Sequence, residues 1–120
     1  MKREKYRRYN YIENENKISI KLKKVKVARY FIEYRKIKNK LEFYDIVFDN
    51  TEKEKLIKYI QYIDKVIQLM SKDCKEFIIN EYIKHYNETT WWVNTYNRST
   101  YYKIRKASLD EFLKYVEWIN

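Results

Sequence analysis

Residues 96–112 read YNRSTYYKIRKASLDEF, and this stretch decides how the C-terminal part of the chain folds. Asn97 is a good N-cap, because its side-chain oxygen can accept a hydrogen bond from a backbone N–H that the first helical turn leaves free. Apolar or small residues then recur at steps of three and four, which is the spacing of one helical face. The stretch therefore predicts a helix that begins at Arg98 and packs one face against a core, namely Tyr101, Ile104, Ser108, Leu109, Phe112 and Val116.

The opposite face of this helix, near its start, carries basic, hydroxyl and aromatic side chains. Such a mixture suits phosphates and base edges, and the helix dipole favours phosphate oxygens at an N-terminus. We expect Arg98 to contact a base, since a guanidinium can bond bidentately to guanine, and Lys103 and Lys106 to contact phosphates. The predicted DNA-binding residues are Arg98, Ser99, Thr100, Tyr102, Lys103, Arg105 and Lys106.

The chain has 120 residues and contains neither Gly nor Pro, which bounds its architecture. A chain of this length supports one modest core, so a single domain is expected. Without Gly and Pro, tight turns must rely on Asn and Asp. We therefore predict an all-α domain of about five helices over residues 17–120, with a helix-turn-helix at about 88–118.

The first third of the chain gives mixed signals. Residues 1–16 have no clear period, and we interpret them as a flexible basic arm or a short added helix. Residues 17–27, KISIKLKKVKV, alternate apolar and polar side chains, which is a strand signal. From Val27 onward the spacing becomes helical, so a helix is predicted over about 24–43. Whether residues 17–27 form helix or strand stays open at this point.

The middle of the chain predicts three more helices. Thr51 followed by Glu54 fits a capping box, in which hydroxyl and carboxylate satisfy free backbone N–H groups reciprocally. Ser71 is expected to cap the following helix, and the segment ETTWWVNT to form about two helical turns before a corner rich in Asn. These predicted helices span residues 52–70, 72–86 and 88–95.

The formal net charge of +10 is unevenly distributed. Residues 1–44 hold 15 Lys and Arg against 5 Asp and Glu, residues 45–97 hold 7 against 9, and residues 98–120 hold 5 against 3. A polyanion would prefer the two basic ends, although a generally Lys-rich proteome would also produce such a charge. The phosphate contacts predicted for the N-terminal region are Lys2, Arg3, Lys5, Arg7, Arg8 and Arg35.

Several functional classes find no support in the sequence. Cys74 and His85 are the only residues of their types, so they cannot assemble a thiolate or imidazole metal cluster. We expect Cys74 to be a buried structural thiol and His85 to occupy a helix end. No carboxylates are paired for acid–base work, so no enzyme and no cofactor is expected. No apolar run approaches a membrane span, and a reducing, cytoplasmic location is predicted.

Residues 90–116, TWWVNTYNRSTYYKIRKASLDEFLKYV, resemble the C-terminal end of the autolysin-regulator (ArpU-type) phage transcriptional regulators and, more distantly, region 4 of the sigma-70 class. The shared pattern is a hydroxyl-rich cap, the paired tyrosines with basic residues, and Ser108-Leu109 followed by Phe112. Residues 28–38 and 63–83 also resemble helices that precede the reader helix in such regulators. The resemblance implies a sigma-like or phage-like transcription regulator of a low-GC bacterium.

Three functions remain open at this stage. The leading hypothesis is a sequence-specific regulator of transcription that binds double-stranded DNA through the helix starting at Arg98. The alternatives are a protein-interaction module that docks on RNA polymerase, and a protein that binds RNA or single strands. For the last, Trp91 and Trp92 could be a stacking platform, although a tryptophan pair also serves as core and rim. The target, the direction of regulation and the oligomeric state are not encoded in any recognisable pattern.

Overall fold

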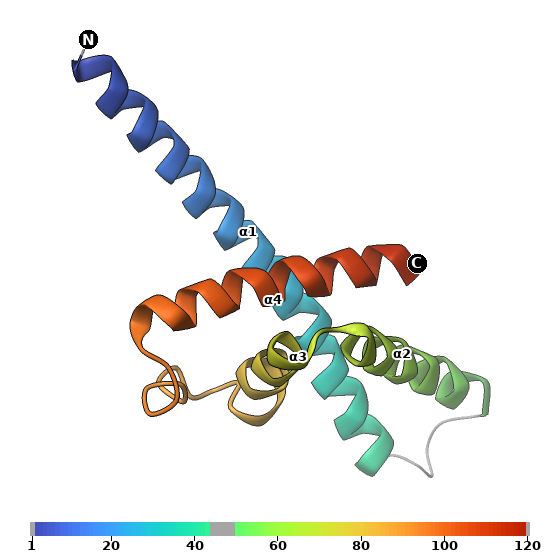
Figure 1. Cartoon of the computed structure of the whole chain (residues 1–120). Helices are drawn as coiled ribbons and strands as arrows, with labels where there is room; N and C mark the ends of the chain where they lie inside the picture. Colours follow the sequence, from blue (N-terminus) through green and yellow to red (C-terminus); the bar gives the residue numbers. More distant parts are fainter. Residues whose placement is uncertain (1, 44–49, 120) are drawn as a thin grey trace.

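The computed structural model describes residues 2–43 and 50–119, and the side chains of residues 19–42 and 51–119. Every regular element in these ranges is helical, which confirms the all-α prediction. Instead of about five helices, the described residues form four α-helices and one π-helical turn (Figure 1). None of these helices is long and apolar enough to cross a membrane. The elements are α1 (Lys2–Phe43), α2 (Asn50–Leu69), α3 (Lys72–Ile79), η1 (Asn80–Lys84) and α4 (Arg98–Ile119).

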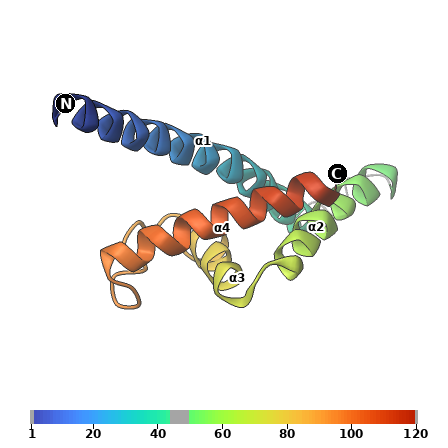
Figure 2. The same cartoon turned by 45° about the horizontal axis from the view of Figure 1, so that its top comes forward.

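The helix α1 is a single element of 42 residues, about 63 Å long at the usual helical rise. Its C-terminal half packs against the other helices, and its N-terminal half extends away from them (Figures 1 and 2). This extension explains the longest dimension of the molecule, 69 Å. Residues 2–16 are helical and continuous with the rest of α1, so they form no separate helix, while their predicted flexibility stays a prediction.

The alternating segment 17–27 is also part of α1, and the predicted helix start near Lys24 is therefore wrong. The pattern was ambiguous because apolar side chains occupy two sides of this helix. Val27 is fully buried, whereas Leu22 and Val25 are at least half exposed. An alternation of Lys with Ile, Leu and Val satisfies both a strand period and this two-sided helix.

The core lies where α1, α2, α3 and α4 meet, and each helix contributes one apolar stripe. The predicted inward face of α4 is confirmed, since all its members are buried except Ile104, which is half-buried. Phe112 lies at the centre, with its ring centroid 5.1 Å from that of Phe31 on α1. Cys74 is buried in the same core, as expected of a structural thiol. The fully buried side chains are Val27, Phe31, Ile63, Val66, Phe77, Ile78, Ser108, Leu109, Phe112 and Val116.

The predicted helix starts are partly correct. Thr51 lies inside α2, which begins at Asn50, so the capping box at Thr51 and Glu54 is not formed. Ser71 does precede α3, but its side chain makes no capping hydrogen bond. Instead the Ser71 hydroxyl donates to a carboxylate oxygen of Glu111 on α4 at 2.9 Å, and its backbone N–H also points to that carboxylate. This contact joins the start of α3 to the middle of α4.

The helix predicted over 72–86 is divided in the structure. The α-helical part ends at Ile79, and η1 follows, closed by a bond from the His85 N–H to the Asn80 carbonyl at 2.8 Å. This wider turn places Tyr82 against Phe31, with the two rings stacked at a centroid distance of 5.1 Å. Polypeptide π-turns are rare and often mark positions where side chains are re-aimed.

The connection between η1 and α4, residues 85–97, contains turns and no helix. The two-turn helix predicted over ETTWWVNT is therefore absent, and with it the tight corner of a helix-turn-helix motif. Thr and Val lower the helix propensity of this segment, and the packing of Trp91 on Phe77 and of Trp92 on Tyr101 competes with a regular helix. The start of α4 therefore contacts α3 and η1, and residues 85–97 connect η1 to α4.

Candidate nucleic-acid interface

The start of α4 is fixed by the residue that the sequence identified. The Asn97 side-chain oxygen accepts a hydrogen bond from the Thr100 N–H at 2.8 Å. The Asn97 carbonyl accepts the first helical bond, from the Tyr101 N–H at 2.9 Å. Both the N-cap at Asn97 and the helix start at Arg98 are thus confirmed.

Most of the predicted contact residues lie on the solvent side of α4. The side chains of Arg98, Ser99 and Thr100 are exposed in its first turn, and those of Lys103 and Lys106 follow on the next two turns. Tyr102 retains 46% of its accessible surface. No Asp or Glu occurs between residues 89 and 109, and Asp110, one helical turn after Lys106, pairs with Lys23 of α1 at 2.6 Å.

Arg105 differs from the other predicted contact residues because it is half-buried. Its guanidinium lies over the Tyr102 ring at 4.8 Å and over the Tyr101 ring at 5.8 Å. Its Nε atom is buried and has no hydrogen-bond partner in the described part of the chain. Arg105 therefore holds the tyrosine pair through cation–π contacts, and it reaches solvent less freely than Lys103.

The first turns of α4 are anchored to η1 through Glu81. Its carboxylate accepts hydrogen bonds from the Tyr101 hydroxyl at 2.7 Å and from the Trp91 indole N–H at 3.3 Å. Burial raises the pKa of Tyr101, and the hydrogen bond to Glu81 adds to this effect. Tyr101 is therefore a neutral donor at ordinary pH, as the geometry requires.

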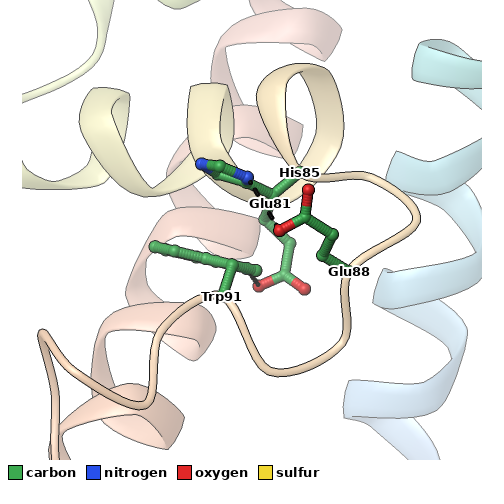
Figure 3. Close-up of polar contacts among 4 residues, drawn as sticks. All are labelled: Glu81, His85, Glu88 and Trp91. Atoms are coloured by element: carbon green, nitrogen blue, oxygen red, sulfur yellow. Dashed lines mark hydrogen bonds and ion pairs between the residues drawn. The ribbon is translucent and has the colours of Figure 1, made fainter.

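The connection 85–97 is held by the same anchor (Figure 3). The His85 ring stacks on Trp91, with centroids 5.9 Å apart and planes inclined by 10°. His85 Nδ1 lies 3.3 Å from a Glu88 carboxylate oxygen without hydrogen-bond geometry. His85 closes η1, which confirms its predicted position at a helix end.

Trp91 and Trp92 both pack against neighbouring aromatic side chains. Both are half-buried, and Trp92 stacks on Tyr101 at a centroid distance of 4.3 Å while its N–H donates to the Thr89 carbonyl at 3.0 Å. Trp91 packs against Phe77 of the core, with centroids 5.8 Å apart. Of the two interpretations left open by the sequence, core and rim fits this geometry better than a stacking platform.

The predicted phosphate contacts near the N-terminus have different outcomes. Arg35 is half-buried, donates to the Tyr82 carbonyl at 2.7 Å, and lies over the Tyr86 ring at 4.1 Å, so it connects α1 to η1. Its phosphate contact stays a prediction. The side chains of Lys2, Arg3, Lys5, Arg7 and Arg8 lie outside the described residues.

The structure also shows exposed cations on α1 that the sequence did not single out. Lys21, Lys24, Lys26 and Arg29 are exposed cations of α1, in a stretch from 16 to 32 that has no acidic residue. Lys23 pairs with Asp110 of α4 at 2.6 Å and so joins the two helices at their surface. The density of Lys in this stretch already indicated an exposed basic surface, but the strand-like alternation obscured which side chains share a face of the helix.

Comparison of the chain with protein-family models, curated proteins and solved structures gave no match. Within the described residues, no three His, Cys, Asp or Glu side chains gather in an arrangement that could hold a metal ion.

Proposed function

We propose that this chain binds double-stranded DNA through the first three turns of α4 and regulates transcription. The observation that carries the proposal is the exposure of Arg98, Lys103 and Lys106 near a capped helix N-terminus, in a stretch from 89 to 109 without an acidic residue. Cations there neutralise phosphates, and the helix dipole adds a favourable field for phosphate oxygens. The resemblance of residues 90–116 to ArpU-type regulators and sigma region 4 supports this assignment for the α4 part alone, because the tight corner of a helix-turn-helix is absent before Asn97.

The proposal assigns different tasks to neighbouring residues. Arg98 lies in the first turn, from which a side chain can reach a base edge when a helix end enters the major groove. Lys103 and Lys106 are placed for phosphates, which position the protein without reading the sequence. The Ser99 and Thr100 hydroxyls can donate hydrogen bonds to either a phosphate or a base. Tyr102, held by Arg105, gives this face a planar side chain beside the cations.

A single set of binding assays tests the proposal. A duplex selected from random sequences, an unselected duplex, single-stranded DNA, RNA and core polymerase are compared for binding to the parent protein. Arg98→Ala should lose preference for the selected duplex, by about 1–3 kcal/mol of discrimination, while retaining non-specific binding. Lys103→Ala should weaken both duplexes by similar factors.

Lys58→Ala is the matched control, because Lys58 is an exposed cation on α2, outside the proposed face. It removes the same charge and should change duplex binding less than Lys103→Ala. The assignment would be wrong if folded Arg98→Ala and Lys103→Ala proteins bound the selected duplex as tightly and selectively as the parent. Tighter binding of single strands or of polymerase than of any duplex would favour the corresponding alternative.

A further inference from the structure

A hollow of about 430 Å³ lies where α1, α2 and the C-terminal half of α4 meet, at the end of α4 opposite to Arg98. Figure 2 shows this half of α4 running beside α2. The volume falls in the range of about 300–1,000 Å³ that is typical of ligand-binding clefts. The residues that line it are Lys26, Arg29, Tyr30, Tyr59, Leu113 and Glu117.

The hollow has an apolar floor and a charged rim. Tyr30, Tyr59 and Leu113 are half-buried and pack against the core, whereas the lining cations and Glu117 are exposed. A floor that is partly desolvated beneath a polar rim is the usual anatomy of a binding surface that accepts an anchoring side chain.

Hydrogen bonds between the helices hold this floor in place. The Tyr59 hydroxyl of α2 donates to the Tyr30 carbonyl of α1 at 2.8 Å, and the Tyr62 hydroxyl donates to the Val116 carbonyl of α4 at 2.6 Å. Burial raises the pKa of Tyr59 to about 12, so this donor stays protonated at ordinary pH. The surface is therefore formed before any partner arrives, which lowers the entropic cost of binding.

Exposed apolar surface continues beyond the hollow along α1 and along α4. A second hollow, of about 650 Å³, is lined by Lys114, Tyr115, Glu117 and Trp118. Trp118 keeps 74% of its surface exposed, the largest fraction among the exposed large apolar side chains of the described residues. On α1, Leu22 is 59% exposed and lies one helical turn before Lys26. Such an elongated surface fits an extended segment better than a compact small molecule.

The charges around this surface indicate what the segment must carry. Lys26, Arg29 and Lys114 surround the two hollows, and Glu117 is the only acid that lines them. A second copy of this chain, with its net charge of +10, would bring cations against cations. We propose that the surface formed by α1, α2 and the C-terminal half of α4 binds an acidic peptide segment of another protein, with apolar side chains as anchors.

This inference goes beyond the proposed DNA contact and is independent of it. Leu113 follows Arg98 by roughly 22 Å along α4, at the usual helical rise. A single helix would thus present one surface to DNA and another to an acidic partner. The proposed DNA contact uses Arg98, Lys103 and Lys106, and none of these side chains lines either hollow.

The test uses the full chain and two labelled synthetic peptides. In one, aspartates flank leucine and phenylalanine, and in the other, lysines replace the aspartates. The parent should bind the acidic peptide and perturb the NMR signals of Tyr59 and Leu113. Lys26→Glu combined with Arg29→Glu should weaken this binding about tenfold or more and improve binding of the lysine peptide. Lys21→Glu combined with Lys24→Glu is the charge-matched control, since both lysines are exposed on α1 but do not line the hollow.

A charge-neutral variant separates this inference from the DNA proposal. Trp118→Ser should weaken the acidic peptide and leave duplex binding at the parent level, whereas Arg98→Ala should leave peptide binding intact. The inference is overturned if the acidic peptide does not bind, if both peptides bind equally, or if the double variant binds the acidic peptide as the parent does. It is also overturned if the surface proves to join two copies, seen as a dimer in sedimentation that Trp118→Ser dissolves.

Discussion

The hydrogen bond from the Tyr101 hydroxyl to the Glu81 carboxylate should stabilise the fold more than the hydroxyl of the adjacent Tyr102 does. Tyr101→Phe removes the hydroxyl that donates to the Glu81 carboxylate at 2.7 Å and leaves the ring in place. Hydrogen bonds to charged groups contribute roughly 1.5–3 kcal/mol, and the half-buried position of Glu81 lets water replace part of this. We therefore expect a loss of roughly 1–2 kcal/mol in the free energy of unfolding.

Tyr102→Phe provides the control at the adjacent position. Tyr102 is exposed and its hydroxyl does not belong to the Glu81 network, so the change should stay within about 0.5 kcal/mol. Urea unfolding followed by far-UV circular dichroism gives both values from the transition midpoints. If Tyr101→Phe were as stable as the parent and Tyr102→Phe, Glu81 would not anchor α4 in the way that the geometry indicates.

Three further predictions concern the cap, the core and the tyrosines. Asn97→Ala removes the acceptor for the Thr100 N–H and should cost about 1 kcal/mol in urea unfolding, and Asn97→Gly only a few tenths; equal losses would argue against the side-chain cap. Phe112→Ala empties a fully buried position and should cost about 3–5 kcal/mol or prevent folding, while Phe112→Leu, which leaves a smaller cavity, should fold with a smaller loss in thermal melts. Because the folded pKa of Tyr59 is raised from 10.0 to about 12, its neutral form is favoured by folding. The resulting stability is complete below pH 10.0 and is lost as the pH rises toward about 12. Burial also raises the pKa of Tyr82 and Tyr101, so an ultraviolet titration of Tyr59→Phe should show one fewer late-ionising tyrosine than that of the parent.

The sequence predicted the features of α4 well because their causes are local. An Asn cap and an apolar period of three to four residues are properties of neighbouring positions, and both Asn97 and the stripe from Tyr101 to Val116 are confirmed. The all-α class was equally accessible, since a chain without Gly and Pro has few ways to make tight turns.

The features that were missed depend on contacts between distant residues. Glu81 anchors Tyr101 across 20 positions, and Arg35 reaches Tyr82 across 47, so no periodicity in the sequence marks either contact. The segment before Asn97 fails to become a helix because Trp91 and Trp92 pack on Phe77 and Tyr101 instead. Tertiary packing overrides local propensity at such positions.

The buried stripe of α4 sets the orientation of both proposed surfaces at once. Successive residues of a helix point about 100° apart, so a slip of one position would turn Lys103, Lys106 and Leu113 by that angle from their present directions. Leu109, Phe112 and Val116 prevent such a slip because all three are fully buried among side chains from the other helices. Substitutions in this stripe should therefore disturb the two surfaces together, whereas those at Arg98 or Trp118 act on one surface alone. Because the centre of α4 is buried and its two ends are exposed, each surface can be tested separately.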